Sequence, residues 1–349
     1  MLYVCKIKVI PMDITEKFEL IKINTEEIVT EEDLKTLLAT KSNIKAYYGI
    51  APTGPFHISY LIPLSKVLDC IEIGIECTIL IADLHAVLDD LKSSWDDVSI
   101  KAEYYKKCIE LSLPIKRKVK FVLGSDYQLE KNYILDVLKV STLMTVTRAT
   151  RAASEVTRMK NPKVSELIYP IMQCLDEVAL GADISIGGID QRHIYAAAHD
   201  YLQKIGYKAT VDIYTPIVSG LKGPGTKMSA SIPESHIKVY DSKDAIKRKI
   251  NGAYCPQAVV SNNPIMQLCQ HIIFSFRKEL LIERSSKFGG DLKFSTYNDL
   301  KNTYLSGELH PMDLKNAVVR ELCDIFARCR EYFENNRDIL LALGQEFIP

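Results

Sequence analysis

Residues 51–60 read Ala-Pro-Thr-Gly-Pro-Phe-His-Ile-Ser-Tyr, and the segments on either side of them differ in periodicity. The apolar run 44–51 is typical of a strand, and residues from about 58 to 73 have the spacing of a helix. The prolines and Gly54 favour a tight turn between them. The start of the following helix offers free N–H groups and a positive dipole end, which suit phosphate. His57 could donate to a phosphoryl oxygen there, although a histidine after such a turn is more often an ordinary surface residue.

The same alternation of strand and helix patterns continues over the first two thirds of the chain. Further strands are predicted at 78–82, 119–123, 184–187 and 209–214, and helices at 98–111, 130–157, 164–180 and 189–205. This alternation predicts an α/β fold with a doubly wound, parallel, Rossmann-type sheet. Later residues predict a mostly α-helical domain, with helices at 243–253, 264–276, 297–304 and 311–335. We therefore expect an N-terminal extension over 1–42, the Rossmann-type domain over 43–235 and the helical domain over 236–349.

The composition is that of a globular enzyme with no dominant charge. Lys and Arg number 44, as do Asp and Glu, so a nucleic-acid partner would need a local basic surface. The nine cysteines lack zinc-site spacing, and we expect buried thiols and no metal site. No secretory or transit pattern opens the chain, and no apolar run is long enough to span a membrane. We expect a cytoplasmic protein.

A glycine-rich loop follows the last predicted strand of the sheet. Residues 220–231 read Gly-Leu-Lys-Gly-Pro-Gly-Thr-Lys-Met-Ser-Ala-Ser. The order Gly-Thr-Lys differs from the Gly-Lys-Thr of a phosphate-binding P-loop, which also follows the first strand of its sheet. The segment 220–233 is better interpreted as a mobile arm that brings the ammonium of Lys227 and nearby hydroxyls onto a triphosphate. A solvated flexible loop without function is the alternative.

Two further groups of polar residues have the spacing of a binding site. Tyr169, Gln173 and Asp176 are spaced i, i+4 and i+7, so they share one face of a predicted helix. That face is either directed at a ligand or simply exposed to solvent. Two glycines before Asp190 would let a ligand approach the backbone closely, and Asp190 could accept from ribose hydroxyls or merely cap a helix.

These signals share a position in the predicted fold. The turn at His57, residues 83–85, residues 125–126, residues 188–191 and the Lys227 loop each follow a predicted strand. In a doubly wound sheet, the carboxyl ends of the strands meet at one edge, where ligands bind. Their convergence there favours a binding site over five unrelated features.

Several stretches together resemble the class I aminoacyl-tRNA synthetases. Residues 52–60 stand where the HIGH signature of that class lies, and residues 227–231 where KMSKS lies. Within the class, the chain is similar to the tyrosyl-tRNA synthetases of the archaeal/eukaryotic branch from about residue 43 onward. The stretches that carry this resemblance are Ala-Tyr-Tyr-Gly at 46–49, Ala-Asp-Leu-His-Ala at 82–86, Ile-Tyr-Pro-Ile-Met-Gln at 168–173, and residues 187–192 and 310–316.

Both signatures depart from the class pattern. The first reads His-Ile-Ser-Tyr and lacks the second histidine, which leaves one fewer imidazole for phosphate. The second reads Lys-Met-Ser-Ala-Ser and lacks the second lysine, so the leaving pyrophosphate must rely on Lys227, Mg²⁺ or another cation.

The resemblance implies that L-tyrosine is activated with ATP, with Mg²⁺ carried by the nucleotide, and then transferred to tRNA(Tyr). The phenol hydroxyl of the substrate would meet Tyr47 and Asp176, and its ammonium Tyr169, Gln173 and Gln191, with His85 and Gln128 nearby. ATP contacts would be Gly49, Thr53, Gly54, His57, Gly188, Asp190, Lys227, Met228 and Ser229, among which His57 and Lys227 are the catalytic residues.

The resemblance also implies partners. Arg192 would lie near the first base pair of the tRNA acceptor stem, and the helical domain would bind the anticodon through Phe288 and Asp313. Residues of about 130–161 resemble the insertion that forms a homodimer interface. Two other interpretations stay open: a tryptophanyl relative, and an RNA-binding protein that kept this fold without catalysis.

Overall fold

The chain folds into two units, each built from segments that are distant in sequence. The computed structural model describes residues 12–89, 93–113, 119–155, 161–226, 228, 232–345 and 347. Unit 1 comprises Met1–Ala51, Lys66–Leu91 and Val119–Pro216, and unit 2 comprises Pro52–Ser65, Lys92–Lys118 and Ile217–Pro349. The domain boundaries expected from the sequence stay a prediction.

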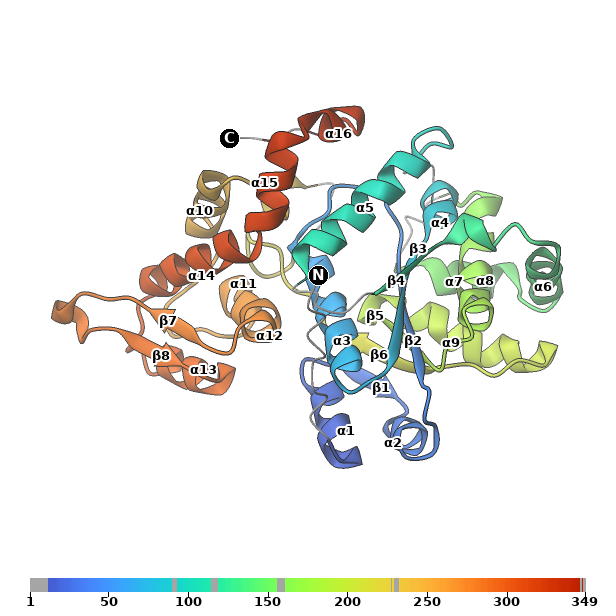
Figure 1. Cartoon of the computed structure of the whole chain (residues 1–349), viewed down its shortest axis with the longest axis horizontal. Coiled ribbons are helices and arrows are strands. Elements are labelled where there is room, and N and C mark those ends of the chain that lie inside the picture. The colour runs from blue at the N-terminus through green and yellow to red at the C-terminus, as the bar shows by residue number, and fades with distance from the viewer. Residues whose placement is uncertain are drawn as a thin grey trace, which may run out of the picture. The chain divides into compact units, whose positions relative to one another are not determined.

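Unit 1 contains a six-stranded sheet with the strand order β1-β6-β5-β2-β3-β4. Its strands are β1 (Glu27–Val29), β2 (Lys45–Ile50), β3 (Glu76–Ile81), β4 (Lys120–Leu123), β5 (Ile184–Gly188) and β6 (Val211–Thr215) (Figure 1). All neighbours pair in parallel except β1, which is antiparallel to β6. The predicted doubly wound α/β fold is confirmed.

The order of the strands identifies where this sheet should bind ligands. β2 has β3 on one side and β5 on the other, so the order of the chain reverses between β2 and β5. In the register between these two strands, Tyr47 lies opposite Ser185. Such a reversal opens a crevice beyond the carboxyl ends of the two strands. The residues that follow β2 and β5 therefore define the place to look for a site.

Helices follow the sheet strands, and most of those in unit 1 pack against the helix over 164–179 (Figure 1). These helices are α3 (Leu61–Glu72), which begins in unit 2, α4 (Asp83–Leu88), α6 (Lys131–Ser141), α7 (Val146–Ala153), α8 (Val164–Ala179) and α9 (Arg192–Tyr201). The single helix expected over 130–157 is two helices, because Thr145 caps α7 by accepting from the Arg148 N–H at 3.2 Å. The end of the expected segment, residues 156 and 157, lies outside the described residues.

The N-terminal extension takes part in the fold of unit 1. It contributes α1 (Ile14–Lys22), β1 and α2 (Glu31–Thr40). The buried ammonium of Lys66 donates to the carbonyl oxygen of Ile21 at 2.7 Å and also to that of Ile23, and it pairs with Asp69 at 2.8 Å. These bonds fix the end of α1 against α3. The strand β1 was not predicted, because three residues are too few to show an alternating pattern.

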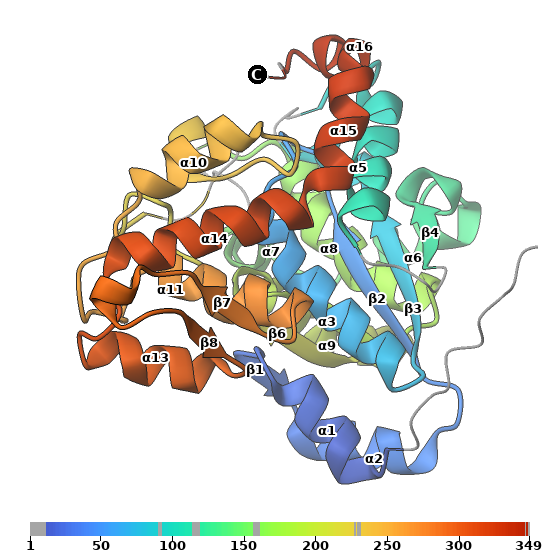
Figure 2. The ribbon, with the colours of Figure 1, turned by 60° about the vertical axis from the view of Figure 1, so that its left-hand side comes forward.

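Unit 2 is mostly helical, as predicted. Its helices are α5 (Val98–Ser112), α10 (Lys243–Asn251), α11 (Pro264–Leu268), α12 (Phe274–Phe276), α13 (Tyr297–Leu305), α14 (Pro311–Ile325), α15 (Ala327–Asn335) and α16 (Arg337–Ala342). Figure 2 shows α15 continuing from α14 and lying beside α5. The hairpin of β7 (Leu280–Ile282) and β8 (Leu292–Phe294) was not predicted. Among the residues described, no helix combines the length and hydropathy needed to cross a bilayer.

Candidate active site

A buried carboxylate lies at the centre of the polar residues of unit 1. Asp176, on α8, is only 1% exposed. Its Oδ1 accepts hydrogen bonds from the Tyr127 hydroxyl, the Gln128 amide and the Tyr133 hydroxyl, each at 2.8 Å. Burial raises the pKa of Asp176, and this rise is opposed by His85 and by the three donors. The predicted polar face of α8 is therefore turned inward, and it is not the solvent-exposed face of the alternative interpretation.

His85 lies on the other side of this carboxylate. Its Nε2 is 3.8 Å from Asp176 Oδ2, and its Nδ1 is 3.4 Å from the Gln128 amide nitrogen. If that amide donates to Nδ1, neutral His85 carries its hydrogen on Nε2, the nitrogen that faces Asp176. Burial lowers the pKa of His85, which favours this neutral form despite the nearby carboxylates. The ring also meets the ring of Tyr169 edge-on, with centroids 4.6 Å apart.

Tyr47 places a second buried hydroxyl in unit 1. It lies on β2, is 2% exposed and packs in a cluster with Tyr195 and Tyr214. Burial raises its pKa well above the usual value, and the charge of Asp176 is among the smaller causes. Within the described part of the chain, His85 Nε2 and Gln128 Oε1 are among the buried atoms that have no partner in hydrogen-bond geometry. The Tyr47 hydroxyl interacts with Tyr195 but forms no bond that meets the same geometry. Buried polar atoms are normally paired, so His85 and Gln128 beside Asp176 have capacity left for a polar ligand.

Two glutamines join the neighbouring elements. Gln173 of α8 donates from Nε2 to Oε1 of Gln191 at 3.1 Å, and Gln191 lies in the turn between β5 and α9. Tyr169 is buried one helical turn before Gln173, and burial raises its pKa. The three side chains assigned to the substrate ammonium thus come from two adjacent segments of unit 1.

The end of β5 leaves little room for side chains at its glycines. A Cβ at Gly187 would lie 2.9 Å from the Tyr195 ring, and one at Gly188 would lie 2.6 Å from Asp190 Oδ1. Asp190 lies inside a short 3-10 turn whose N-cap is Gly188, and the N-cap residue of α9 is Gln191. Asp190 is therefore not a helix cap, which was the alternative interpretation of this residue.

In unit 2, the segment around His57 is buried. His57 is 4% exposed, its ring stacks on Tyr60 at 4.4 Å and lies 4.8 Å from the ring of His236. Burial lowers the pKa of His57 well below its usual value, and His236 adds to this effect. The imidazole is thus neutral and is not the ordinary surface histidine of the alternative interpretation. We expected free N–H groups at this helix start, but the N–H of Ile58 donates to the carbonyl oxygen of Ile237 at 2.9 Å. This amide is therefore not available to phosphate.

The turn before His57 is held by α5. The Gly54 N–H donates to the Tyr105 hydroxyl at 3.3 Å, and the Phe56 N–H donates to the Tyr104 hydroxyl at 2.8 Å. Both tyrosines are buried. The backbone of residues 53–57 is therefore fixed within unit 2 by two phenol oxygens.

The loop of the second signature is partly described. Lys227 and Ser229 lie outside the described residues, whereas Met228 is buried and its sulfur accepts from the Ser59 hydroxyl at 3.1 Å. Gly223 has φ of 99°, and a Cβ there would lie 2.6 Å from Tyr254. The glycine is required by both its conformation and its neighbour.

Comparison with known proteins identifies the family. The family model of class I tRNA synthetases (W and Y) matches residues 39–327. A tyrosine–tRNA ligase of Archaeoglobus fulgidus is 44% identical over 313 residues, which are 89% of this chain and 95% of that protein. The chain belongs to the tyrosine–tRNA ligase family of class I synthetases.

A second relative and a solved structure extend the comparison. The cytoplasmic enzyme of Danio rerio is 38% identical over 326 residues, which are 92% of this chain and 61% of that protein. The crystal structure of the A. fulgidus tyrosyl-tRNA synthetase complexed with L-tyrosine has a TM-score of 0.88 and 42% identity, and covers 91% of this chain and 99% of that one. The predicted enzyme class, tyrosine–tRNA ligase, is confirmed, and its activity implies use of ATP, tyrosine and tRNA(Tyr). The tryptophanyl and non-catalytic interpretations are not supported.

Two tyrosines that donate to Asp176, Tyr127 and Tyr133, were not predicted from the sequence of this tyrosine–tRNA ligase. Tyr127 directly precedes Gln128 at the end of β4, so its position on the ligand-binding edge was a usable signal. Tyr133 lies on α6, where nothing in the sequence distinguishes it from other buried apolar positions. Only the packing of α6 against α8 brings its hydroxyl to Asp176.

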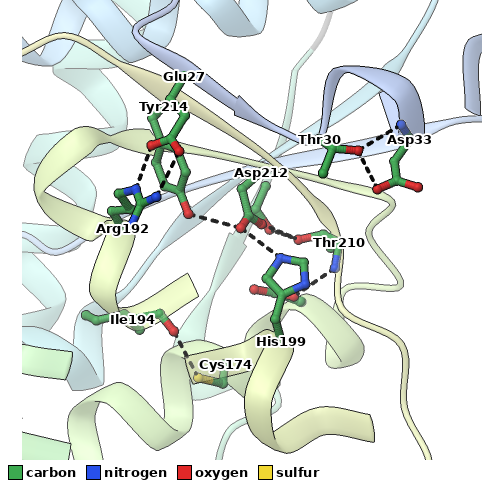
Figure 3. Close-up of polar contacts among 12 residues, drawn as sticks. Glu27, Thr30, Asp33, Cys174, Arg192, Ile194, His199, Thr210, Asp212 and Tyr214 are labelled. Atoms are coloured by element: carbon green, nitrogen blue, oxygen red, sulfur yellow. Dashed lines mark hydrogen bonds and ion pairs between the residues drawn. The ribbon is translucent and has the colours of Figure 1, made fainter. Parts of the chain in front are cut away.

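Arg192, predicted to contact tRNA, is paired with the N-terminal extension. Its Nε lies 2.6 Å from Glu27 Oε2 and its Nη2 lies 2.9 Å from Glu27 Oε1. Figure 3 shows this pair beside Tyr214, whose hydroxyl donates to the buried Asp212 at 3.0 Å. Asp212 also lies 3.0 Å from His199 Nε2. The guanidinium is half-exposed and oriented by a carboxylate.

The two residues assigned to the anticodon lie in different elements of unit 2. Phe288 is 69% exposed in the connection between β7 and β8. Asp313 lies in the first turn of α14, whose N-cap is His310. An exposed phenyl ring suits base stacking, whereas the position of Asp313 also fits a favourable interaction with the helix dipole.

Proposed function

We propose that this tyrosine–tRNA ligase binds the phenol of L-tyrosine at Asp176 and Tyr47. The observation that carries the proposal is a buried carboxylate whose Oδ1 holds three donors, while its Oδ2 has no donor within hydrogen-bond distance among the described side chains. The substrate hydroxyl donates to the carboxylate and accepts from Tyr47. A polar site of this kind rejects phenylalanine because the buried groups would then stay unpaired; tyrosine–tRNA ligases are a standard example of such selectivity without editing.

The same proposal assigns the substrate ammonium to Tyr169, Gln173 and Gln191. All three present oxygen atoms that can accept from an ammonium, and the Gln173–Gln191 hydrogen bond of 3.1 Å keeps the two amides together. His85 and Gln128 lie beside them and contribute through Asp176.

The nucleotide is assigned to the residues expected from the signatures. In unit 1 these are Gly49, Gly188 and Asp190, of which the last two lie at and just after the carboxyl end of β5. In unit 2 they are Thr53, Gly54, His57, Lys227, Met228 and Ser229. Neutral His57 donates an N–H to a phosphoryl oxygen, and Lys227 places a positive charge on the leaving pyrophosphate.

The reaction needs positioning more than acid–base chemistry. The tyrosine carboxylate is already a nucleophile, so it attacks the α-phosphate of ATP without a dedicated base, and pyrophosphate leaves. Mg²⁺, carried by ATP, neutralises phosphate charge. The tyrosyl group then passes to a ribose hydroxyl of the 3′-terminal adenosine of tRNA(Tyr). Orientation and charge stabilisation supply the acceleration.

A homodimer is also proposed, through α6 and its neighbours. One face of α6 is buried through Tyr133, Val137 and Val140. Large apolar side chains are nevertheless exposed on and around this helix, namely Leu129, Ile134, Leu135, Leu138, Leu143 and Val146. Exposed apolar clusters of this size are typical of protein interfaces. A second copy of the chain, expected from the family resemblance, would cover them.

The RNA contacts and the location of the enzyme complete the proposal. Arg192 contacts the acceptor stem, and Phe288 and Asp313 contact the anticodon. The name of the Danio rerio relative supports a cytoplasmic location. Tyrosine-dependent exchange of pyrophosphate into ATP, measured against tryptophan and phenylalanine, tests the substrate assignment. Exchange stimulated equally by tryptophan would contradict it.

A further inference from the structure

Asp176 is held in an asymmetric way. The three side-chain hydrogen bonds to its carboxylate all end on Oδ1. A carboxylate oxygen offers about two lone-pair sites, so the Tyr127 hydroxyl and the Gln128 amide alone are enough to fill Oδ1. The Tyr133 hydroxyl lies 2.8 Å from Oδ1 and also 2.8 Å from the Met172 carbonyl oxygen, so its single hydrogen is shared between them. The acceptor capacity that remains is on Oδ2, which faces His85 Nε2 at 3.8 Å, beyond hydrogen-bond distance.

The donors come from outside the helix that carries the carboxylate. Tyr127 and Gln128 follow β4, and Tyr133 lies on α6. The rings of Tyr127 and Tyr133 meet edge-on, with centroids 5.6 Å apart, and Tyr133 is buried. Rotation of the Asp176 carboxylate would break bonds to two separate segments at once. The direction of Oδ2 is therefore fixed by Gln128, which the sequence predicted for the site, and by Tyr127 and Tyr133, which it did not.

We propose that Tyr127 and Tyr133 are positioning residues that hold Asp176 so that only Oδ2 is offered to the substrate, and that they thereby set the preference for tyrosine over phenylalanine. This inference rests on the proposed binding of the substrate phenol at Asp176. A phenol donates to the fixed Oδ2, whereas a phenylalanine ring leaves that oxygen buried and unpaired. The penalty against phenylalanine is largest when the carboxylate has no other orientation.

The test uses Tyr127→Phe, Tyr133→Phe and the double variant, each of which removes only hydroxyl groups. The measurement is kcat/KM for pyrophosphate exchange with tyrosine and with phenylalanine. Tyr127→Phe is expected to lower kcat/KM for tyrosine about tenfold, the size of one hydrogen bond to a charged group. Tyr133→Phe is expected to lower it by less, because the Tyr133 hydrogen is shared with the Met172 carbonyl oxygen. The value for phenylalanine is expected to change less than about threefold, so that the tyrosine-to-phenylalanine ratio falls about as much as the tyrosine value.

The chain offers a matched control. The Tyr207 hydroxyl donates to Asp136 of α6 at 2.7 Å, so Tyr207→Phe also removes a phenol–carboxylate bond to this helix, away from Asp176. This variant is expected to keep the tyrosine-to-phenylalanine ratio of the parent enzyme. A fall in that ratio equal to that of Tyr133→Phe would overturn the proposal, because it would show a general effect of loosening α6.

Two other results would also contradict it. If kcat/KM falls equally with tyrosine and phenylalanine and Tm is lower, the hydroxyls only support packing. If the tyrosine-to-phenylalanine ratio is unchanged in all three variants, the hydroxyls do not position Asp176. Should Tyr133→Phe fail to fold, Tyr127→Phe decides alone, since Tyr127 is only half-buried. Asp176→Asn distinguishes the positioning role from the proposed binding of the phenol at Asp176. An unchanged tyrosine-to-phenylalanine ratio in Asp176→Asn refutes phenol binding at Asp176. A large fall of that ratio in Asp176→Asn, with no change in the Tyr127 and Tyr133 variants, refutes the positioning role only.

Discussion

Arg192 and Glu27 form a two-point ion pair, with distances of 2.6 and 2.9 Å, between residues 165 positions apart in the chain. The pair joins the start of α9 to β1 in the N-terminal extension. Arg192 lowers the pKa of Glu27, so the carboxylate stays ionised at neutral pH. Both side chains are partly exposed, so the pair contributes about 0–1 kcal/mol to stability. Its main consequence is a fixed orientation of the guanidinium.

Arg192→Gln is therefore expected to affect tRNA more than the fold. If Arg192 contacts the acceptor stem, KM for tRNA in the charging reaction should rise about tenfold, since one lost contact is worth about 1–3 kcal/mol. Pyrophosphate exchange should stay within twofold. Glu27→Gln removes the same ion pair but keeps Arg192, and it serves as the control. An equal rise of KM in both variants would show that the ion pair matters and not a contact between Arg192 and RNA.

Lys227→Ala should slow the activation step itself. The proposed function assigns its ammonium to the leaving pyrophosphate, a contact that would strengthen in the transition state. We expect adenylate formation to slow by about a hundredfold, with little change in the affinity for tyrosine. Stopped-flow measurement of activation at several tyrosine concentrations separates the two quantities. Slowing that arises from weaker tyrosine binding would point to a structural role of the loop.

Asp313→Ala should separate charging from activation. An acidic side chain beside RNA phosphates is useful only as an acceptor for donors on a base edge, such as those of guanine. KM for tRNA is expected to rise about tenfold, or about 1–3 kcal/mol for a base contact, while pyrophosphate exchange is unchanged. A parallel fall of exchange and charging would mean that Asp313 stabilises the first turn of α14, and the RNA role should then be dropped.

Leu135→Glu should weaken the proposed homodimer. Leu135 is 47% exposed on α6, and a charge there would be buried without a partner when two copies associate. Sedimentation at micromolar concentration is expected to show a shift toward monomer. Ile23→Glu places the same charge at a residue that is 58% exposed at the end of α1, outside this apolar cluster. The Ile23→Glu variant should sediment like the parent protein. If Leu135→Glu also sediments like the parent protein, the dimer interface lies elsewhere.

The sequence was sufficient to predict elements whose residues repeat with the period of a helix or a strand. The i, i+4, i+7 spacing of Tyr169, Gln173 and Asp176 predicted that they share one face of α8, and the five parallel strands were predicted from their apolar runs. That this face points inward is shown by the structure. The strand β1 has only three residues and no pattern of its own. It is defined by its pairing with β6, a contact between distant segments that no local period reveals.

The rest of the site depends on packing between elements. Tyr133 reaches Asp176 because α6 lies against α8, and Glu27 meets Arg192 because β1 joins the edge of the sheet at β6. Helix 130–157 was predicted as one element since its apolar spacing continues through residues 142–145, where Thr145 instead caps a new helix. Such choices between two locally reasonable structures are made by tertiary contacts.

The central claim is that Asp176 recognises the phenol hydroxyl of tyrosine. Asp176→Ala leaves the Tyr127 and Tyr133 hydroxyls without their carboxylate partner and removes the acceptor for the substrate. The most direct test is kcat/KM for tyrosine activation in this variant, measured by pyrophosphate exchange beside the parent enzyme. A loss of about 3 kcal/mol or more of transition-state binding, roughly a hundredfold or greater, is predicted. A change below about threefold, which is under 1 kcal/mol, would contradict the assignment.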